Sequence, residues 1–424
     1  MKVLSLFDGM ACGALALQAA GIEIESYDAF EIDKYAIETA VHNFPFIKQH
    51  GDVFAADFTE FEGVDLLCGG SPCTYWSIAQ TNNRETEASG MGWELFSQYV
   101  RAVKEAKPKY FVYENNKSMS KAIRASINEA FGFEAVEINS ALVSAQNRQR
   151  LYWVGKRNED GTYSRVAVEL PKDRGILLKD ILETGGDLTT NNKAYTLTAS
   201  YDGAVAWNTI ERHQRNMVAE PINITCNGKS QCLRATYYKD GIRNIAGNNI
   251  DRKTGLYAIP CCPMAVKEAT KKGYTEIEPF ECVDMTQPNS KTRRGRNMAQ
   301  KSNCCMTSCH YYQYCGVIGY ATPYEWDDQG NVVKAISAAD GKTYAVYEVK
   351  DGIITIRGKT YPIKIVDGLH IIRKLTVKEC MRLQTVPERY QFPVSDSQAY
   401  KMLGNGWTVE VIVHILTYIL KEEH

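Results

Sequence analysis

The sequence predicts an α/β fold with a doubly wound, mostly parallel β-sheet and a second, smaller β-rich domain. Over residues 1–156, short apolar runs that read as buried strands alternate with helical stretches, which is the pattern of βαβ units. Over residues 157–370 the pattern changes to short alternating segments separated by glycine turns, which is typical of an irregular β domain. Residues 371–424 are again helical and apolar, so we expect them to complete the first domain.

The chain begins with a predicted strand, Lys2–Phe7, a tight turn, Asp8–Gly13, and a helical run, Ala14–Ala20. In a doubly wound sheet such a turn presents backbone N–H groups to a cofactor, although this one lacks the G-x-G-x-x-G fingerprint. A second apolar run ends in Glu31, a carboxylate suited to accept hydrogen bonds from two ribose hydroxyls; the alternative is a solvated surface acid. Asp52 follows a third predicted strand, where an aspartate is suited to accept an adenine amino group.

The segment Gly69-Gly70-Ser71-Pro72-Cys73 follows the apolar run Val64–Cys68 and holds the most informative residue of the chain. A buried strand that leads into this turn places the thiol of Cys73 at the carboxyl edge of the sheet, where open α/β sheets build their sites. Proline fixes its own φ and biases the preceding residue towards extended backbone, so the turn is stiff. Cys73 is therefore a candidate nucleophile, and the alternative is a small buried hydrophobic residue.

Two further groups belong with this thiol. Glu114 ends another apolar strand, and because parallel strands end on the same side of a sheet, we expect it to neighbour Cys73 and to serve as a proton donor. Arg148 and Arg150 lie two residues apart in an extended segment, so they share one face with Gln146. The alternatives are a helix-initiating polar cluster for the acid and a salt-bridged edge strand for the arginines.

Together these groups suit a reaction at cytosine. The Cys73 thiolate adds to C6 while Glu114 supplies a proton or hydrogen bond at N3 and an arginine contacts O2, which converts the ring into an enamine. Its C5 then attacks an electrophilic methyl group, and loss of the C5 hydrogen expels the thiolate. Because a duplex shields these ring atoms, the target base must swing out of the stack.

In its ordered motifs the chain resembles the C5-cytosine DNA methyltransferases, which depend on S-adenosyl-L-methionine. The motifs span nearly the whole chain in the family's order: Phe7-Asp8-Gly9, Glu31, Asp52, Ser71-Pro72-Cys73, Glu114-Asn115, Gln146-x-Arg148-x-Arg150, Lys374-Leu375-Thr376-x-x-Glu379-x-x-Arg382-Leu383-Gln384 and Gly404-Asn405-Gly406. The resemblance implies a class I methyltransferase, Rossmann-like catalytic domain over residues 1–156 and 371–424. It also implies a target-recognition domain over residues 157–370.

The resemblance assigns roles to individual residues. Cys73 is the nucleophile, Glu114 the acid, and Arg148 with Arg150 hold the flipped base. The positions that bind the cofactor are Phe7, Asp8, Gly9, Gly13, Glu31, Ile32, Asp52, Val53, Pro72, Asn405, Gly406 and Trp407. Those expected to contact DNA are Ser77, Arg84, Gln146, Arg293, Arg294 and Arg296.

Two local features qualify this assignment. Residues 74–93 resemble the family's mobile loop, which closes over DNA; the alternative is an ordinary surface loop. Where the family usually has valine after Glu-Asn, this chain has Asn116, so we expect a more polar surface behind the flipped base.

The formal net charge of the 424 residues is −1, but basic residues exceed acidic ones within residues 157–370. The basic runs Lys291–Arg296 and Arg212–Arg215 are therefore expected to contact phosphates, with a solvated loop as the alternative. Nine of the 13 cysteines lie between Cys226 and Cys315 without a C-x-x-C pair. Reduced thiols without a metal are expected there, and a structural zinc site is the alternative.

We expect a cytoplasmic monomer of a bacterial or phage-infected cell that acts on double-stranded DNA, with a cognate restriction endonuclease as a candidate partner. We expect no signal peptide. No apolar stretch of about 18 residues suggests a membrane span. Two other functions stay open: an enzyme acting on transfer RNA, which typically has a compact middle region, and a silent regulatory relative, which would lack the thiol or the acid. The target sequence and the use of an unusual sulfonium donor also stay open.

Overall fold

The computed structural model describes residues 1–77, 84–187, 192–222, 332–337 and 339–421, and the backbones of six short strands between residues 264 and 326. The chain forms two compact units, residues 1–218 with 374–424 and residues 219–373. The larger unit is discontinuous, because both ends of the chain contribute to it.

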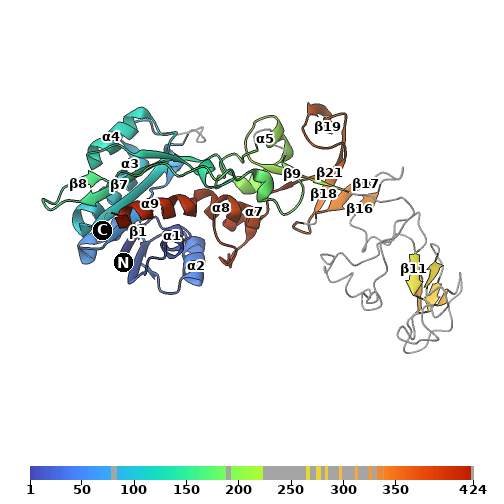
Figure 1. Ribbon diagram of the computed structural model, residues 1–424, viewed down its shortest axis with the longest axis horizontal. Coiled ribbons are helices and arrows are strands. Elements are labelled where there is room, and N and C mark those ends of the chain that lie inside the picture. The colour runs from blue at the N-terminus through green and yellow to red at the C-terminus, as the bar shows by residue number, and fades with distance from the viewer. Residues whose placement is uncertain are drawn as a thin grey trace. The chain divides into compact units, whose positions relative to one another are not determined.

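A mostly parallel sheet is the centre of the larger unit (Figure 1), and its strands follow the order β3-β2-β1-β4-β5-β7-β6, with β8 beside β7. The first five strands run parallel, whereas β7 runs antiparallel to its neighbours β5, β6 and β8. This arrangement confirms the predicted fold class. The strands are β1 (Lys2–Leu6), β2 (Ser26–Phe30), β3 (Lys48–Gln49), β4 (Leu66–Gly69), β5 (Tyr110–Asn116), β6 (Val136–Asn139), β7 (Gln149–Arg157) and β8 (Tyr163–Arg165).

Helices cover both faces of this sheet, with α3 and α4 on one side and α1, α2 and α9 on the other (Figure 1). Thr376 caps α7 through a reciprocal pair of hydrogen bonds with Glu379, as its position before a helical run predicts. The helices of the unit are α1 (Cys12–Ala19), α2 (Lys34–Asn43), α3 (Gly90–Ala106), α4 (Lys121–Phe131), α5 (Ala206–Ile210), α7 (Val377–Leu383), α8 (Asp396–Asn405) and α9 (Val409–Lys421). Strand β9 (Gly186–Asp187) also belongs to it.

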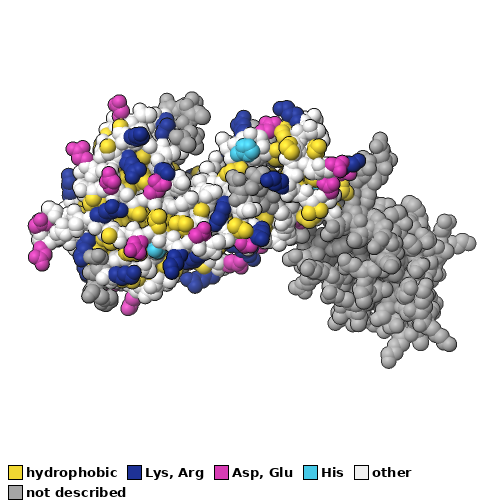
Figure 2. Space-filling view, turned by 45° about the horizontal axis from the view of Figure 1, so that its top comes forward, with side chains coloured by type: hydrophobic (Ala, Val, Ile, Leu, Met, Phe, Trp, Pro, Cys, Tyr) yellow, Lys and Arg dark blue, Asp and Glu magenta, His cyan; other side chains and the backbone are white. Residues whose placement is uncertain are grey.

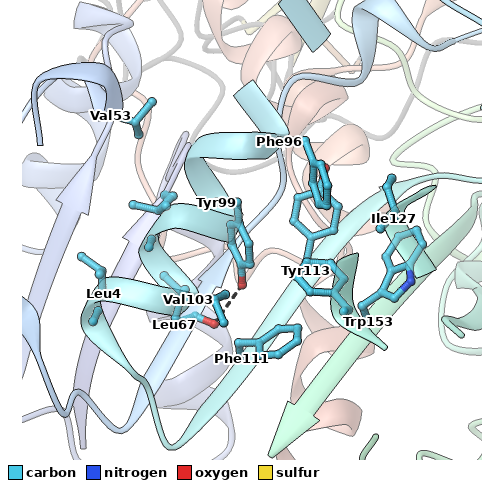
Figure 3. Packing of buried hydrophobic residues seen from close by; sticks show 14 of the residues in the cluster. Leu4, Val53, Leu67, Phe96, Tyr99, Val103, Phe111, Tyr113, Ile127 and Trp153 are labelled. Carbon is cyan, nitrogen blue, oxygen red and sulfur yellow. Dashed lines mark hydrogen bonds between the residues drawn. The ribbon is translucent and has the colours of Figure 1, made fainter. Parts of the chain in front are cut away.

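The core under α3 is rich in aromatic rings (Figure 3). Tyr99 of α3 donates its hydroxyl to the carbonyls of Leu67 and Val112, at 3.2 and 2.9 Å, and so ties the helix to β4 and β5. Phe111 packs against Phe131 of α4 with 4.8 Å between ring centroids. These contacts fix the strands whose carboxyl ends carry the candidate nucleophile and acid.

The carboxyl-terminal helices pack into the larger unit. Residues Asp396–Lys421, which comprise α8 and α9, are long and apolar enough by composition to cross a membrane, a stretch that the sequence interpretation did not identify. Half of that apolar window is buried inside the protein, and Ile412, Ile415 and Ile419 of α9 lie in the core. Burial among other elements explains the apolar composition of these helices.

The boundaries between the units differ from the predicted ones at 156/157 and 370/371. Residues 157–218 belong to the larger unit, because β8 pairs with β7 and the backbone of Ala194 bonds to Ala145 and Asn147. Gly404 permits the same packing, since a β-carbon there would lie 2.2 Å from the carbonyl carbon of Thr198. These long-range contacts carry no periodic signal in the sequence.

The smaller unit is β-rich in its described residues. One antiparallel arrangement follows the order β16-β17-β18-β21-β10, with the hairpin of β19 and β20 attached to β18. The predicted turns at Asp351-Gly352 and Arg357-Gly358 are present, and all four residues have φ between 52° and 75°. The chain enters and leaves this unit on neighbouring strands, because the N–H of Ile222 donates to the carbonyl of Leu369 at 2.7 Å.

The strands of this arrangement are β10 (Met217–Pro221), β16 (Tyr324–Trp326), β17 (Val332–Ile336), β18 (Thr343–Lys350), β19 (Ile353–Ile356), β20 (Lys359–Pro362) and β21 (Gly368–Lys374). Two smaller groups of strands pair separately: β11 (Met264–Lys267) with β12 (Tyr274–Ile277), and β13 (Cys282–Asp284) with β14 (Arg296–Asn297) and β15 (Tyr311–Gln313).

Candidate active site

The loop after β4 holds Cys73 against the end of β5. A β-carbon on Gly69 would lie 2.3 Å from the carbonyl oxygen of Leu6, and one on Gly70 would lie 2.9 Å from Oε2 of Glu114. Only glycine fits this close approach of the two strand ends. The predicted proximity of the Cys73 loop to Glu114 is therefore present in the fold.

The loop that carries the candidate nucleophile, residues 70–77 and called the nucleophile loop below, is stiffened on both sides of Cys73. Pro72 precedes a short 3₁₀ turn, Cys73–Tyr75, and the N–H groups of Trp76 and Ser77 donate to the carbonyl of Cys73 at 3.1 and 3.0 Å. The indole of Trp76 is buried and donates to Glu85 at 3.0 Å. These contacts leave the thiol of Cys73 partly exposed on an anchored loop.

The other described cysteines are unsuited to attack a substrate. Burial raises the pKa of the Cys12 and Cys68 thiols to about 12, and it raises the pKa of Cys380 well above its ordinary value. The thiolate is the nucleophilic form, so these buried thiols are inert near neutral pH. Of the four cysteines whose side chains the structure describes, Cys73 is the one that is not buried.

Glu114 is held through both of its carboxyl oxygens. Arg150 of the antiparallel neighbour β7 approaches Oε1 with its Nε at 3.0 Å. Trp407, which lies between α8 and α9, donates its indole N–H to Oε2 at 3.0 Å. The carboxyl group is only 9% exposed, so its orientation is set by the protein.

A polar network behind the acid connects it to the nucleophile loop, and the sequence interpretation missed it. The hydroxyls of Ser71 and Tyr113 lie 2.7 Å apart, and Asn115 donates to the carbonyl of Ser71 at 3.1 Å. Asn116 donates its side-chain amide to the carbonyl of Cys73 at 3.3 Å. Asn116, noted above only as a departure from the family pattern, is therefore a direct tie to the nucleophile turn.

The guanidinium of Arg148 is committed to the backbone. It donates to the carbonyls of Leu197, Gly404 and Gly406 at 2.9, 3.1 and 2.9 Å. Burial lowers the pKa of Arg148 to about 10. The two predicted arginines therefore have different partners. Arg150 contacts the carboxyl group of Glu114, whereas Arg148 donates to carbonyls near residues 197 and 404–406 and so connects two distant segments of the chain.

Arg148→Met is expected to lower the free energy of unfolding by about 3 kcal/mol or more, because it leaves three carbonyls without their charged donor. Urea denaturation followed by circular dichroism measures this loss. Arg157→Met, at the exposed far end of β7, the strand that follows Arg148, is the matched control and is expected to change stability by less than about 0.5 kcal/mol. Equal stability of the two variants would contradict the bracing role.

Gln146, predicted to contact DNA, lies in the interior instead. It is 0% exposed, its side-chain oxygen accepts from the N–H of Leu197 at 2.6 Å, and its amide nitrogen donates to the carbonyl of Leu383 at 3.3 Å. The spacing of Gln146 with Arg148 correctly indicates a shared environment. That environment consists of backbone groups from distant parts of the chain rather than a DNA-facing surface.

Arg84, also predicted to contact DNA, braces the nucleophile loop. Its guanidinium donates to the carbonyls of Ser118 and Trp76 at 2.6 and 3.3 Å. Ser77 lies at the end of the described part of this loop, and residues 78–83 are outside the described residues. The mobile-loop hypothesis for residues 74–93 therefore stays a prediction.

The remaining predicted DNA contacts cannot be placed by their side chains. Arg293 and Arg294 lie outside the described residues, and only the backbone of Arg296 is described, in β14. Figure 2 shows basic side chains interspersed with acidic ones over the described part of its face. The described residues contain no group of three metal-ligating side chains, and most of the cysteine-rich segment lies outside them.

The turn after β1 has an unusual backbone. Phe7, Gly9 and Ala11 have φ of 57°, 59° and 58°, a region that side-chain-bearing residues rarely adopt. The carboxylate of Glu31 holds the turn, because it accepts hydrogen bonds from the N–H groups of Gly9, Ile32 and Asp33, each at 2.8 Å. Strained backbone of this kind concentrates at functional sites.

Asp8 lies under this turn with one oxygen unused. Its Oδ1 accepts hydrogen bonds from Ser5 and Tyr27 at 2.6 and 2.7 Å, whereas its buried Oδ2 has no partner among the described residues. Burial raises the pKa of Asp8 from 3.8 to about 6. A carboxyl group with a raised pKa stabilises the fold while it is protonated, and this contribution is lost as pH rises from about 4 through about 6.

Asp8→Asn is expected to remove this pH dependence. Relative to the parent protein, the variant should gain about 2 kcal/mol of unfolding free energy between pH 4.5 and pH 7.5, because asparagine keeps an acceptor for Ser5 and Tyr27 without a buried charge. Urea denaturation of both proteins at the two pH values measures this difference. A gap that does not change with pH would contradict the buried, ionising carboxyl group.

The predicted cofactor positions Ile32, Asp52 and Val53 differ in their exposure to solvent and in their contacts. Ile32 is 73% exposed beside Glu31, which leaves a bare apolar side chain next to the turn. Asp52 caps a 3₁₀ turn by accepting from the N–H of Phe54 at 3.0 Å, and the side chain of Val53 is buried in the core rather than exposed to a ligand. Sequence reasoning missed Phe54, an aromatic ring that is 46% exposed at the end of this turn.

The motif Gly404-Asn405-Gly406 packs against the turn after β1. A β-carbon on Gly406 would lie 3.2 Å from Sγ of Cys12 and 3.6 Å from Sδ of Met10, so Gly406 permits close contact with the start of α1. A β-carbon on Gly13 would lie 2.7 Å from the hydroxyl of Tyr27, so this glycine serves packing of α1 on the sheet. Asn405 is exposed at the end of α8.

The family model described as C-5 cytosine-specific DNA methylase matches residues 1–421. The chain is 27% identical to the orphan methyltransferase M.SPRI of Bacillus phage SPR, over 100% of this chain and 99% of that protein. It is 28% identical to the type II methyltransferase M1.ScrFI of Lactococcus lactis subsp. cremoris, over 57% of this chain and 62% of that protein.

Among solved structures, the chain is similar to the Dnmt2 methyltransferase of S. pombe, with a TM-score of 0.44, 13% identity and coverage of 100% of this chain and 99% of that one. It is also similar to a mutant DNMT2 of Spodoptera frugiperda, with a TM-score of 0.48, 14% identity and coverage of 99% of both chains.

Proposed function

The chain belongs to the C-5 cytosine-specific DNA methylase family and is a DNA cytosine-5-methyltransferase, and from this premise we propose its mechanism, cofactor and partners. It transfers a methyl group from S-adenosyl-L-methionine to C5 of a cytosine flipped out of a specific duplex sequence, through a covalent bond between Cys73 and C6. The observation that carries this proposal is the meeting of the Cys73 loop and Glu114 at one edge of the sheet.

In this mechanism Cys73 loses its proton, and its sulfur forms a bond to C6 of the ring. Glu114 donates a proton to N3, so the electron pair displaced from the C5–C6 double bond is held as an enamine. C5 then forms its bond to the methyl group, whose bond to the sulfonium sulfur of the donor would break and leave a neutral thioether. Loss of the C5 proton to a water molecule re-forms the double bond, breaks the bond between the Cys73 sulfur and C6, and returns the N3 proton to Glu114.

The acid and the nucleophile loop are oriented before the target cytosine binds. Arg150 orients Glu114, and the hydrogen bonds of Ser71, Tyr113 and Asn115 orient the loop. Groups fixed in advance lower the barrier, since they need not reorganise as charge develops on the ring.

The residues around the first turn fit S-adenosyl-L-methionine. Glu31 lies at the tip of β2 as an acceptor for ribose hydroxyls, and its Oε2 accepts from the N–H of Gly9. The exposed side chain of Ile32 offers an apolar surface for adenine, and the unpartnered Oδ2 of Asp8 is an acceptor for a polar group. When bound, this cofactor supplies an electrophilic methyl group.

Double-stranded DNA is the proposed substrate, and residues 157–370 are its proposed recognition segment. The relatives named type II methyltransferases favour a cognate restriction endonuclease as a functional partner, whereas the phage relative named an orphan methyltransferase favours action without one. We place the enzyme in the cytoplasm of a bacterium or phage-infected cell, as a monomer.

A methyl-transfer assay tests the proposal. The full-length protein is incubated with tritium-labelled S-adenosyl-L-methionine and either duplex DNA or transfer RNA, and the products are digested to nucleosides. We expect label in DNA as 5-methyldeoxycytidine. Label confined to transfer RNA, or no label with either substrate, would overturn it. Methylome sequencing of cells that express the protein then identifies the target sequence.

A further inference from the structure

The indole of Trp407 makes a contact that a role in cofactor binding does not require. Its N–H donates to Oε2 of Glu114 at 3.0 Å, across 293 residues of sequence. Arg150 contacts the other oxygen, Oε1, and the backbone of Gly70 packs so closely that a β-carbon there would lie 2.9 Å from Oε2. Trp407 is therefore the described residue that fixes this oxygen of the acid.

The backbone that carries Trp407 is itself held in place. The carbonyl of Gly406 accepts hydrogen bonds from Arg148 at 2.9 Å and from Gln384 at 3.3 Å. On its other side Gly406 packs against the sulfur atoms of Met10 and Cys12 at the start of α1. The indole is thus attached to the turn where the cofactor is proposed to bind.

We propose that Trp407 is a positioning residue for the methyl transfer, acting through Glu114. Its N–H holds Oε2 of the acid in the orientation that meets the target cytosine. Because its backbone packs on the turn after β1, Trp407 connects the geometry of the cofactor site to that of the acid. This inference deepens the proposed function and rests on it.

Loss of one hydrogen bond to a charged group corresponds to about a tenfold to hundredfold change in rate. We therefore expect Trp407→Phe to lower kcat by about tenfold or more, while the KM for DNA and the Kd for S-adenosyl-L-methionine stay within about threefold. A second variant carries β-(3-benzothienyl)alanine at position 407, which keeps the bicyclic ring and replaces the N–H by sulfur. It should show the same loss of kcat with unchanged melting temperature.

A double-mutant cycle with Glu114→Ala separates this role from a structural one. If Trp407 acts through the acid, Trp407→Phe should lower the single-turnover rate in the Glu114 protein but change it less than about twofold in the Glu114→Ala background. Equal losses in both backgrounds, or a loss confined to cofactor affinity, would overturn the inference.

Trp153→Phe is the matched control. It also removes an indole N–H from a hydrogen bond, to Asn128 at 2.9 Å, in the core of the same unit. We expect it to lower the melting temperature but to leave kcat within about twofold. A wild-type protein that labels no DNA would instead count against the proposed function, so the two failures are distinguishable.

Discussion

Cys73→Ala is expected to abolish methyl transfer, with a fall in kcat of at least about ten-thousand-fold, while the protein still binds duplex DNA. C5 of cytosine is a poor nucleophile, and without the bond between sulfur and C6 no enamine forms. The buried thiols of Cys12, Cys68 and Cys380 cannot replace it, because burial raises the pKa of each.

The measurement uses duplex DNA in which 5-fluorocytosine replaces the target cytosine. Fluorine cannot leave C5 as a proton does, so the parent enzyme should form a covalent adduct that survives denaturing electrophoresis, and Cys73→Ala should form none. Cys380→Ala, which removes a buried thiol from the same unit, is the control and should form the adduct at the parent rate. An adduct with Cys73→Ala would exclude the mechanism.

Glu114→Gln is expected to lower turnover by about a hundredfold or more, because an amide cannot donate a proton to N3 as a carboxylic acid does. Glutamine has nearly the same shape, and its single oxygen accepts from Trp407 at the cost of the contact with Arg150, so the loop and the affinity for DNA should be kept. Single-turnover methyl transfer and a DNA-binding titration on the same preparation measure the two quantities separately.

Glu137→Gln provides the control for this change. Glu137 lies on β6, which β7 separates from the strand of Glu114, and pairs with Lys117 at a more exposed position, so its replacement should leave turnover within about twofold. Unchanged turnover in Glu114→Gln would contradict the role of this residue as the acid. A parallel loss of DNA affinity would indicate a binding role instead.

The sequence predicts the convergence of Cys73 and Glu114 because that convergence follows from a general rule. Each residue ends an apolar run, and the carboxyl ends of neighbouring parallel strands meet at one edge of a sheet. The register of β4 with β5, which pairs Gly69 with Tyr113, meets that expectation. Local patterns also predict the cap at Thr376 and the two glycine turns near residues 351 and 357.

The partners of Arg148 and Gln146 could not be predicted in the same way. Their spacing indicates a shared face, but their hydrogen-bond partners are carbonyl and N–H groups of residues 197, 383, 404 and 406, which any amino acid would supply. Backbone groups have no sequence signature, so only the folded chain reveals which side chains they bind. The same reason explains why the packing of residues 157–218 in the larger unit could not be predicted.

The paired strands at the base of the smaller unit have an evolutionary consequence. Since Ile222 and Leu369 are hydrogen-bonded, the two ends of the segment 222–369, called the excursion here, lie on adjacent strands. The length of this segment adds little to the entropy cost of closing the loop. Ancestral recombination could therefore exchange the excursion for another of different size without disturbing the sheet that performs the chemistry. With the proposed recognition segment carried between these two strands, a lineage built this way can acquire new targets while inheriting its catalyst intact.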